Sequence, residues 1–246
     1  MLSTCLLVAA SLFGQAQPGS IEEFLDELAA KRSAMDSLRI HFIMDNKSAD
    51  SMKTDGGYLV YARPRRIVFH ILDEAQEKDD IVYLVDQDKV YEHDIQLEQI
   101  RVFDRSTASD MQALFAAFEA DSSELRRLYD ISILEPSKAE ESDVDKIMEL
   151  HLRLGENSAQ EETLFKGLRV YLRKDDWLPI RLEVDNLPES SVLFRFHQFE
   201  INPALKDTDT QLAAPKDTVI IENDETVETV NRAVKYLPEP ITTQDS

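Results

Sequence analysis

Residues suited to acid–base or nucleophilic chemistry are dispersed along the 246-residue chain. The five histidines share no H-x-x-x-H or H-E-x-x-H spacing, which is the spacing that binds zinc in metalloproteases: His41, His70, His93, His151 and His197. His93 and Asp94 are adjacent on a predicted strand, where neighbouring side chains point to opposite faces. The six glycines form neither a G-x-S-x-G turn nor a Gly-rich phosphate loop. We therefore predict that the protein is not an enzyme, with no catalytic residue, bound metal or cofactor.

The first residues have the features of a signal peptide. The apolar run from Leu2 to Gly14 has the length of a signal-peptide core and is shorter than the about 20 residues of a membrane span. Gly14 and Ala16 form a G-x-A site, so we expect residues 1–16 to be removed after Ala16 and the remainder to be periplasmic. No Lys or Arg precedes the apolar core, which is atypical of a signal peptide. The alternative interpretation of this segment is a buried N-terminal helix. The only cysteine, Cys5, lies in this segment, so the processed chain would have no disulfide.

The charge of the chain limits its partners. The formal net charge is −21, from 48 acidic and 27 basic residues. This charge repels phosphate backbones and anionic lipid surfaces, so we expect no nucleic-acid binding. Solubility explains the acidity most simply, and a basic docking patch on a partner is the alternative. We expect a monomer.

Two segments have the apolar spacing of amphipathic helices. Ser20 and Glu23 form an S-x-x-E capping box that begins the first helix, which we expect to end near Ser33. Its apolar stripe follows the spacing i, i+3, i+4, i+7: Ile21, Phe24, Leu25 and Leu28. The same spacing recurs once in mid-chain: Met111, Leu114, Phe115 and Phe118.

Most of the remaining chain alternates apolar and polar residues with a period of two, which indicates strands. We predict strands at 38–44, 59–63, 67–71, 81–86, 89–94, 97–103, 129–135, 146–154, 163–173, 179–185, 191–201 and 218–222. The polar stretch from Asp45 to Gly57 is expected to be a loop. Short polar joints at 86–89, 174–176 and 186–190 favour an antiparallel meander, hence a sandwich or a barrel. We predict one domain over 17–224 and a flexible C-terminal extension over 225–246.

The order of these elements predicts how they pack. A sheet of about ten strands must curl. Helices packed against its curved face would close an apolar cavity, which suits a hydrocarbon ligand. The alternative is that the helices complete an ordinary core.

Several stretches follow one another in an order that a known family shares. The central ones are GGYLVYARPRRIVFHI, which contains Gly57 and Arg63-Pro64, and the hairpin IVYLVDQDKVYEHDIQLEQIRVF, which contains Tyr91. The opening helix and first strand precede them, and a closing segment with Asn202 and QLAAPKDTVIIEND follows. Together these stretches resemble the periplasmic lipoprotein carrier family, LolA, over most of residues 20–224.

The resemblance implies a mainly β fold with covering helices, an open antiparallel half-barrel that encloses an apolar cavity. It also implies a carrier that takes lipoproteins from an inner-membrane ABC transporter and moves them across the periplasm to an outer-membrane acceptor. Their acyl chains would occupy the cavity, where each buried CH₂ contributes about 0.8 kcal/mol. A periplasmic module that senses a lipid or lipoprotein and regulates a membrane signalling partner is the alternative.

The resemblance also suggests roles for single residues. In the family, the arginine of Arg-Pro bonds to lid-helix backbone and holds the empty form closed, which implies that Arg63 is a lid latch. A surface arginine paired with a carboxylate is the alternative. The candidates for the acyl-chain cavity are apolar or aromatic: Phe42, Leu59, Tyr61, Phe69, Met111, Leu114, Phe115 and Phe118. For these residues the alternative is plain core packing.

Overall fold

The computed structural model describes residues 20–222 except 64–65, 74, 76, 87, 106–117, 119–124, 127–128, 135–146, 155–164 and 187–189, and also residues 225–229 and 234–236. Its first elements are α1 (Ile21–Ser33), β1 (Ser37–Lys47), β2 (Met52–Ala62), β3 (Arg66–Leu72), β4 (Asp79–Val85), β5 (Lys89–Asp94) and β6 (Gln99–Asp104). The middle of the chain forms β7 (Tyr129–Leu134), β8 (Ile147–Leu154), β9 (Phe165–Arg173), β10 (Pro179–Asn186) and β11 (Ser191–Ile201). The last elements are the 3-10 helix η2 (Asp207–Thr210), β12 (Leu212–Ala214), β13 (Val219–Glu222), β14 (Glu225–Thr229) and β15 (Val234–Tyr236).

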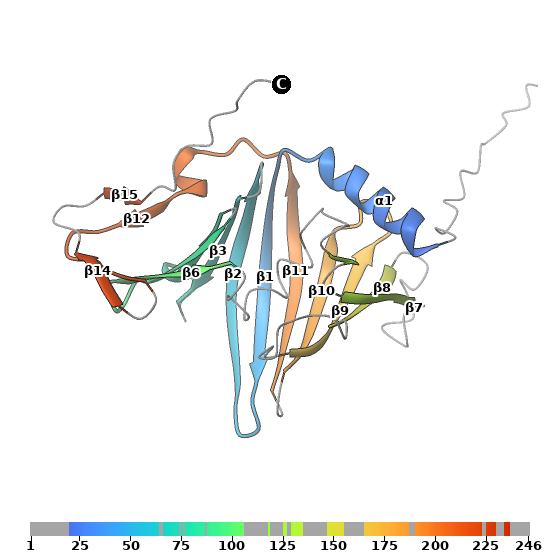
Figure 1. Ribbon diagram of the computed structural model, residues 1–246, viewed down its shortest axis with the longest axis horizontal. Helices are drawn as coiled ribbons and strands as arrows, with labels where there is room; N and C mark the ends of the chain where they lie inside the picture. The colour runs from blue at the N-terminus through green and yellow to red at the C-terminus, as the bar shows by residue number, and fades with distance from the viewer. Residues whose placement is uncertain are drawn as a thin grey trace, which may run out of the picture.

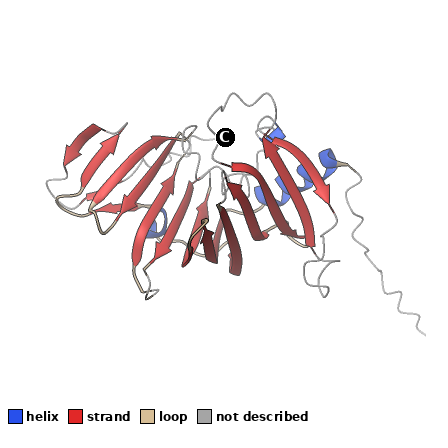
Figure 2. Cartoon of the chain, turned by 90° about the horizontal axis from the view of Figure 1, so that it is seen from below, coloured by secondary structure: helices blue, strands red, loops and turns tan. Residues whose placement is uncertain are grey.

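Thirteen of the described strands form one open sheet. Its order is β14-β13-β6-β5-β4-β3-β2-β1-β11-β10-β9-β8-β7, and β12 pairs with β15 in a separate small sheet. Figure 1 shows α1 at the β7–β10 side of the large sheet, and Figure 2 shows how strongly that sheet curves. The predicted mainly β, open and antiparallel architecture is confirmed, except that β13 pairs with β6 in parallel. Of the expected covering helices, α1 is described in full, whereas only Phe118 of the predicted mid-chain stripe is described.

The first helix begins where its sequence predicts. The Ser20 hydroxyl accepts a hydrogen bond from the Glu23 backbone N–H at 3.1 Å, which satisfies one of the free donors of the first turn. Phe24, Leu25 and Leu28 are buried, so the apolar stripe is the face that packs. The helix ends at Ser33 and the chain turns into β1.

The loop expected over Asp45–Gly57 was a wrong prediction. β1 continues to Lys47 and β2 starts at Met52, so only a tight joint separates them. Both faces of this hairpin end are exposed and hence polar, so its composition resembles that of a loop. Hydrogen bonding across the strands maintains the pairing, including one from the Thr54 hydroxyl to the Asp45 carboxylate at 2.8 Å.

The two faces of the sheet bury different sets of side chains. We call the face toward α1 the inner face; its main core contains Phe24 of α1 and Ile40, Leu152 and Leu168 of the strands. The opposite, outer face carries a second cluster, which we call the outer cluster: Val68, Val82, Leu84, Ile100, Val102, Leu212, Ala214 and Ile220. The strands therefore alternate between two buried environments over part of the sheet.

The outer cluster is closed by the segment 203–218, which links β11 to β13 and is called the strap below. Asn202, at φ 53°, redirects the chain into it and accepts a hydrogen bond from the Asp36 N–H at 2.8 Å. η2 lies against β2 and β3, and an Arg39–Asp209 ion pair of 2.9 Å holds it there. Leu212 of β12 is buried in the outer cluster. The strap thus covers the outer face on the β1–β6 side.

The C-terminal residues that are described are paired strands. β14 pairs with β13 at the edge of the large sheet, and β15 pairs with β12. The predicted domain boundary at residue 224 falls between β13 and β14, and the flexibility of the extension stays a prediction. Among the described residues, no helix has both the length and the apolar character needed to cross a membrane.

Candidate functional site

An aromatic floor lies at the centre of the inner face, where β1, β2, β3 and β11 meet. The Phe42 and Phe69 rings are stacked with centroids 4.3 Å apart. Phe194 stands edge-on to both, at 5.9 and 6.0 Å. Phe118, from the mid-chain stripe, stands edge-on to Phe196 at 5.4 Å. These rings form one packed aromatic cluster on this face, and Phe42 and Phe69 are each only 1% exposed.

The structure places five of the eight predicted cavity residues. Phe42, Leu59, Phe69 and Phe118 are buried in the main core, and Tyr61 packs against it partly exposed. The other three lie outside the described residues: Met111, Leu114 and Phe115. The five that are described gather on one face, and their contact with a ligand stays a prediction.

A glycine makes the ring stack possible. Gly57 of β2 is paired with Phe42 on one side and Ile71 on the other. A Cβ at this position would lie 2.0 Å from the His70 carbonyl oxygen and 2.5 Å from Phe42 Cζ. No side chain fits there, so only glycine lets the Phe42 ring lie over β2.

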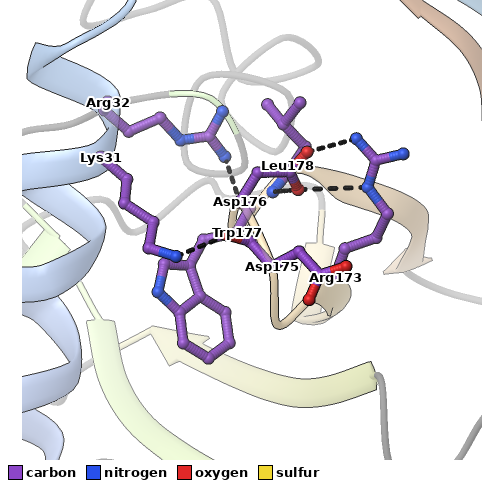
Figure 3. A network of polar contacts seen from close by, with 7 residues as sticks. All are labelled: Lys31, Arg32, Arg173, Asp175, Asp176, Trp177 and Leu178. Carbon is purple, nitrogen blue, oxygen red and sulfur yellow. Dashed lines mark hydrogen bonds and ion pairs between the residues drawn. The ribbon is translucent and has the colours of Figure 1, made fainter. Parts of the chain in front are cut away.

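The end of α1 is fastened to the turn between β9 and β10 (Figure 3). The Arg32 guanidinium donates to the Trp177 carbonyl at 2.8 Å, and the Lys31 ammonium donates to the Asp175 carbonyl at 2.6 Å. Phe24 stands edge-on to the Trp177 ring at 5.3 Å. Arg32 is only 5% exposed, and burial lowers its pKa to about 10, although nearby Asp176 opposes the shift. We call Lys31, Arg32 and the turn 173–178 the α1 anchor.

The turn that receives these bonds is itself rigidly built. Trp177 has a positive φ of 56°, which a tryptophan adopts only when its surroundings enforce it. The Asp176 carboxylate accepts from Arg173 Nε at 3.1 Å and from the Leu178 N–H at 3.0 Å (Figure 3). The Trp177 and Asp175 carbonyls are therefore fixed in place for α1.

Arg63, the predicted lid latch, lies near the same C-terminal end of the helix as the α1 anchor, where the chain passes from α1 into β1. Its side chain is 43% exposed and stands 3.8 Å from the Asp36 carboxylate, between α1 and β1. Its backbone N–H donates to the Asp36 carbonyl at 3.0 Å. The latch role of Arg63 stays a prediction. Sequence reasoning missed Arg32, whose position four residues after Leu28 continues the buried stripe of α1.

The inner face is not equally covered along the sheet. On the α1 side, Leu152, Leu168 and Leu182 of β8 to β10 are fully buried. Toward β4, Ile81 and Tyr83 pack against the main core but stay partly exposed. Ile131 and Ile133 of β7 are partly exposed as well, so the inner face is incompletely covered on both sides of its centre.

Four of the five histidines, which are far apart in the sequence, form one row across the outer face. The strand registers place His197 beside His41, His41 beside Tyr58, and Tyr58 beside His70. Val82 separates His70 from His93 in the same row. The Tyr58 and His70 rings are stacked at 4.2 Å. Sequence reasoning missed this row because it depends on the pairing of six strands.

Burial shifts the pKa values of several side chains in this row. It lowers the pKa of His93, which is 3% exposed, and it lowers the pKa of His41, with the neighbouring His197 adding to the effect. Burial also raises the pKa of Tyr58 to about 12, and Asp79 contributes. His70 Nδ1 lies 3.1 Å from the Asp79 carboxylate. Within the described parts of the chain, no group of three or more His, Cys, Asp or Glu is placed to hold a metal ion.

The fold is similar to that of solved proteins at low sequence identity. An uncharacterized conserved protein from Thermus thermophilus aligns with TM-score 0.52 and 9% identity over 83% of this chain and 100% of that chain. A LolA superfamily protein from Nitrosomonas europaea aligns with TM-score 0.43 and 9% identity, over 77% of this chain and 96% of its own. MucB, in the MucA/MucB complex of Pseudomonas aeruginosa, aligns with TM-score 0.41 and 15% identity, over 77% of this chain and 59% of its own.

No protein-family model and no curated protein matches the sequence. The solved structures found to be similar include a LolA superfamily protein. At these identities the likeness concerns the fold alone. We therefore base the functional proposal on the residues of this chain.

Proposed function

We propose that the protein is a periplasmic carrier that binds the acyl chains of lipoproteins on its inner face and moves them from the inner toward the outer membrane. In this proposal the segment 1–16 directs export, an inner-membrane ABC transporter supplies the cargo, and an outer-membrane acceptor receives it. The protein acts by binding and release, without catalysis.

The observation that carries the proposal is an aromatic floor on an inner face that α1 covers at one side only (Figure 1). Two side-chain bonds of the α1 anchor, from Lys31 and Arg32, tie the helix to the 173–178 turn. Breaking the bond of a charged donor costs about 1.5–3 kcal/mol. Burial of about ten CH₂ groups would contribute about 8 kcal/mol. Displacing α1 would also expose Phe24, Leu25 and Leu28, at about 1.5–3 kcal/mol each, so the burial of two or more acyl chains is needed to displace α1 and still bind.

The first experiment measures transfer. Donor vesicles carrying a fluorescent triacylated lipopeptide are mixed with the processed chain, and a complex is isolated and offered to acceptor vesicles. The proposal predicts a stable complex and transfer faster than spontaneous exchange. Ile81→Glu, on the open part of the inner face, should weaken the complex at least about tenfold. Ile43→Glu, an exposed position on the outer face, is the matched control and should leave binding unchanged.

Depletion of the protein from its host separates the carrier from the sensor. For a carrier, lipoproteins should accumulate in the inner-membrane fraction. An unchanged distribution, together with recovery of one membrane regulator on the purified protein, would replace the carrier with the sensing module.

A further inference from the structure

One row of side chains crosses the inner face from the aromatic floor to β6, the third strand from the β14 edge of the sheet. The registers of β2 to β6 place each of its members opposite the next: Leu59, Phe69, Tyr83, Glu92 and Arg101. The row thus joins the centre of the proposed binding face to a pair of charged residues.

Both charged residues point to the inner face, because their neighbours in the chain point to the outer one. Ile100 and Val102, on either side of Arg101, belong to the outer cluster. Tyr91, which precedes Glu92, packs against the same cluster. Successive side chains of a strand alternate between faces, so Glu92 and Arg101 lie on the face of Phe69.

Polarity rises steadily along the row. Leu59 and Phe69 are buried, and the ring of the partly exposed Tyr83 lies 6.4 Å from that of Phe69. Glu92 is 21% exposed and Arg101 is 49% exposed, with 3.6 Å between Arg101 Nη1 and Glu92 Oε1. An amphiphile has the same order of parts, from an apolar chain to a polar head.

The charge at the end of the row is unusual for this molecule. Arg101 is the only lysine or arginine on the inner face of β3 to β6, as far as those strands are described, in a chain of net charge −21. Its contact with Glu92 is longer than a hydrogen bond. A guanidinium has five N–H donors in a fork that matches carboxylate and phosphate oxygens. Half-exposed, it can therefore bind an anionic group while Glu92 stays nearby.

We infer that the inner face prefers a single-chain amphiphile with an anionic head, which binds with its head at Arg101 and its chain across Tyr83 to the aromatic floor. Arg101 lies three strands from Phe69, roughly 14 Å at the usual strand spacing, which a long acyl chain spans. This inference rests on the proposed function, because it assigns a head group to the same acyl-binding face.

The test compares three amphiphiles that share one chain and differ in their heads: palmitate, hexadecyl phosphate and hexadecanol. Each displaces the neutral dye Nile red from the processed full chain. We expect one or both anions to displace the dye at about tenfold lower concentration than the alcohol, the effect of one charge-assisted hydrogen bond. The anion that acts at the lower concentration identifies the head as a carboxylate or a phosphate.

Substitutions then assign the preference to one residue. Arg101→Gln should abolish the difference between anion and alcohol and leave hexadecanol unchanged, whereas Arg101→Lys should keep most of it. Arg153→Gln is the matched control, because Arg153 is exposed on the outer face of β8 and loses the same charge. Thermal unfolding of each variant checks that the fold is intact.

Each outcome bears on a different claim. Equal displacement by alcohol and anions would overturn the inference and leave acyl-chain binding standing. An anion preference that survives in Arg101→Gln would overturn the assignment to Arg101. No displacement by any of the three would overturn the proposed function, and the inference with it.

Discussion

The two halves of the sheet differ in what covers their outer faces. In the half β7–β11 the inner face of β8 to β10 is buried beside α1, whereas Ile131 and Ile133 of the edge strand β7 stay partly exposed, and the outer face carries ion pairs such as Arg169–Glu183 at 2.8 Å. In the half β2–β6 the strap buries the outer face, while Ile81 and Tyr83 on the inner face stay partly exposed.

This difference explains how one sheet can be both stable and open. Each half needs at least one dry face, because buried apolar area is the main source of stability. In the β2–β6 half the strap supplies that dry face from outside. Its inner face is therefore free to stay partly uncovered, and we place the entry of the ligand there.

The strongest way to break this arrangement is a methyl group in β2 at the junction of the halves. Gly57→Ala should lower the free energy of unfolding by about 3 kcal/mol, because the new Cβ meets the His70 carbonyl and the Phe42 ring. Urea unfolding measures the loss. Gly167→Ala in β9 is the control, since its Cβ would approach nothing closer than 3.4 Å, and it should change stability by less than about 1 kcal/mol. Equal effects of the two substitutions would contradict the close packing described for Gly57.

Weakening the strap tests whether it covers the outer face independently of α1. Leu212→Ala should cost about 2–3 kcal/mol, because it leaves a cavity in the outer cluster. Hydrogen exchange should then become faster in η2, β12 and β13 and stay unchanged in α1. Faster exchange in α1 as well would mean that the two covers act as one unit.

Loosening α1 is the complementary change. Arg32→Met removes the bond to the Trp177 carbonyl and leaves that oxygen without its charged donor, so we expect a loss of about 2 kcal/mol. Exchange in α1 should become faster, dye binding to the inner face should increase, and the strap should keep its protection. The control is Lys31→Met, whose bond is more exposed and whose effect should be under about 1 kcal/mol.

Acidification should affect the histidine row and the Asp45–Arg195 ion pair in different pH ranges. Burial holds the folded-state pKa of His93 and His41 below 6.5, so protons bind the unfolded chain first as the pH falls below 6.5, and stability falls with them. Asp45, bonded to Arg195, has a pKa below its usual 3.8, and its contribution is lost only in stronger acid. Unfolding curves against pH should show the first decline shrink in His93→Gln. An unchanged decline in that variant would remove His93 from this explanation.

Much of the fold could be predicted from the sequence, because most strands bury at least one face. The strands predicted at 129–135, 163–173 and 191–201 lie within one or two residues of β7, β9 and β11. β12 was missed because a strand of three residues is too short to show an alternation of apolar and polar residues. Its conformation depends instead on the outer cluster that it covers. β14 and β15 were missed in the same way, as short strands added at an edge.

The candidate site was only partly predictable. The alternation of side chains along the strands predicts that Phe42, Leu59 and Phe69 lie on one face, and in the structure they belong to one core. The partner of a buried arginine, by contrast, depends on which turn lies next to the helix, so Arg32 and Trp177 could not be paired from the sequence. The histidine row and the row that ends at Arg101 depend on the register of successive strands, which the period of two leaves open.

Hydrogen exchange of the processed chain, with and without a triacylated lipopeptide, tests the central claim that acyl chains bind the inner face of the β2–β6 half. We predict slower exchange in β3 and β4, faster exchange in α1 as it is displaced, and no change in the strap. Protection confined to the strap and the outer face, or no change anywhere at saturating lipopeptide, would contradict it.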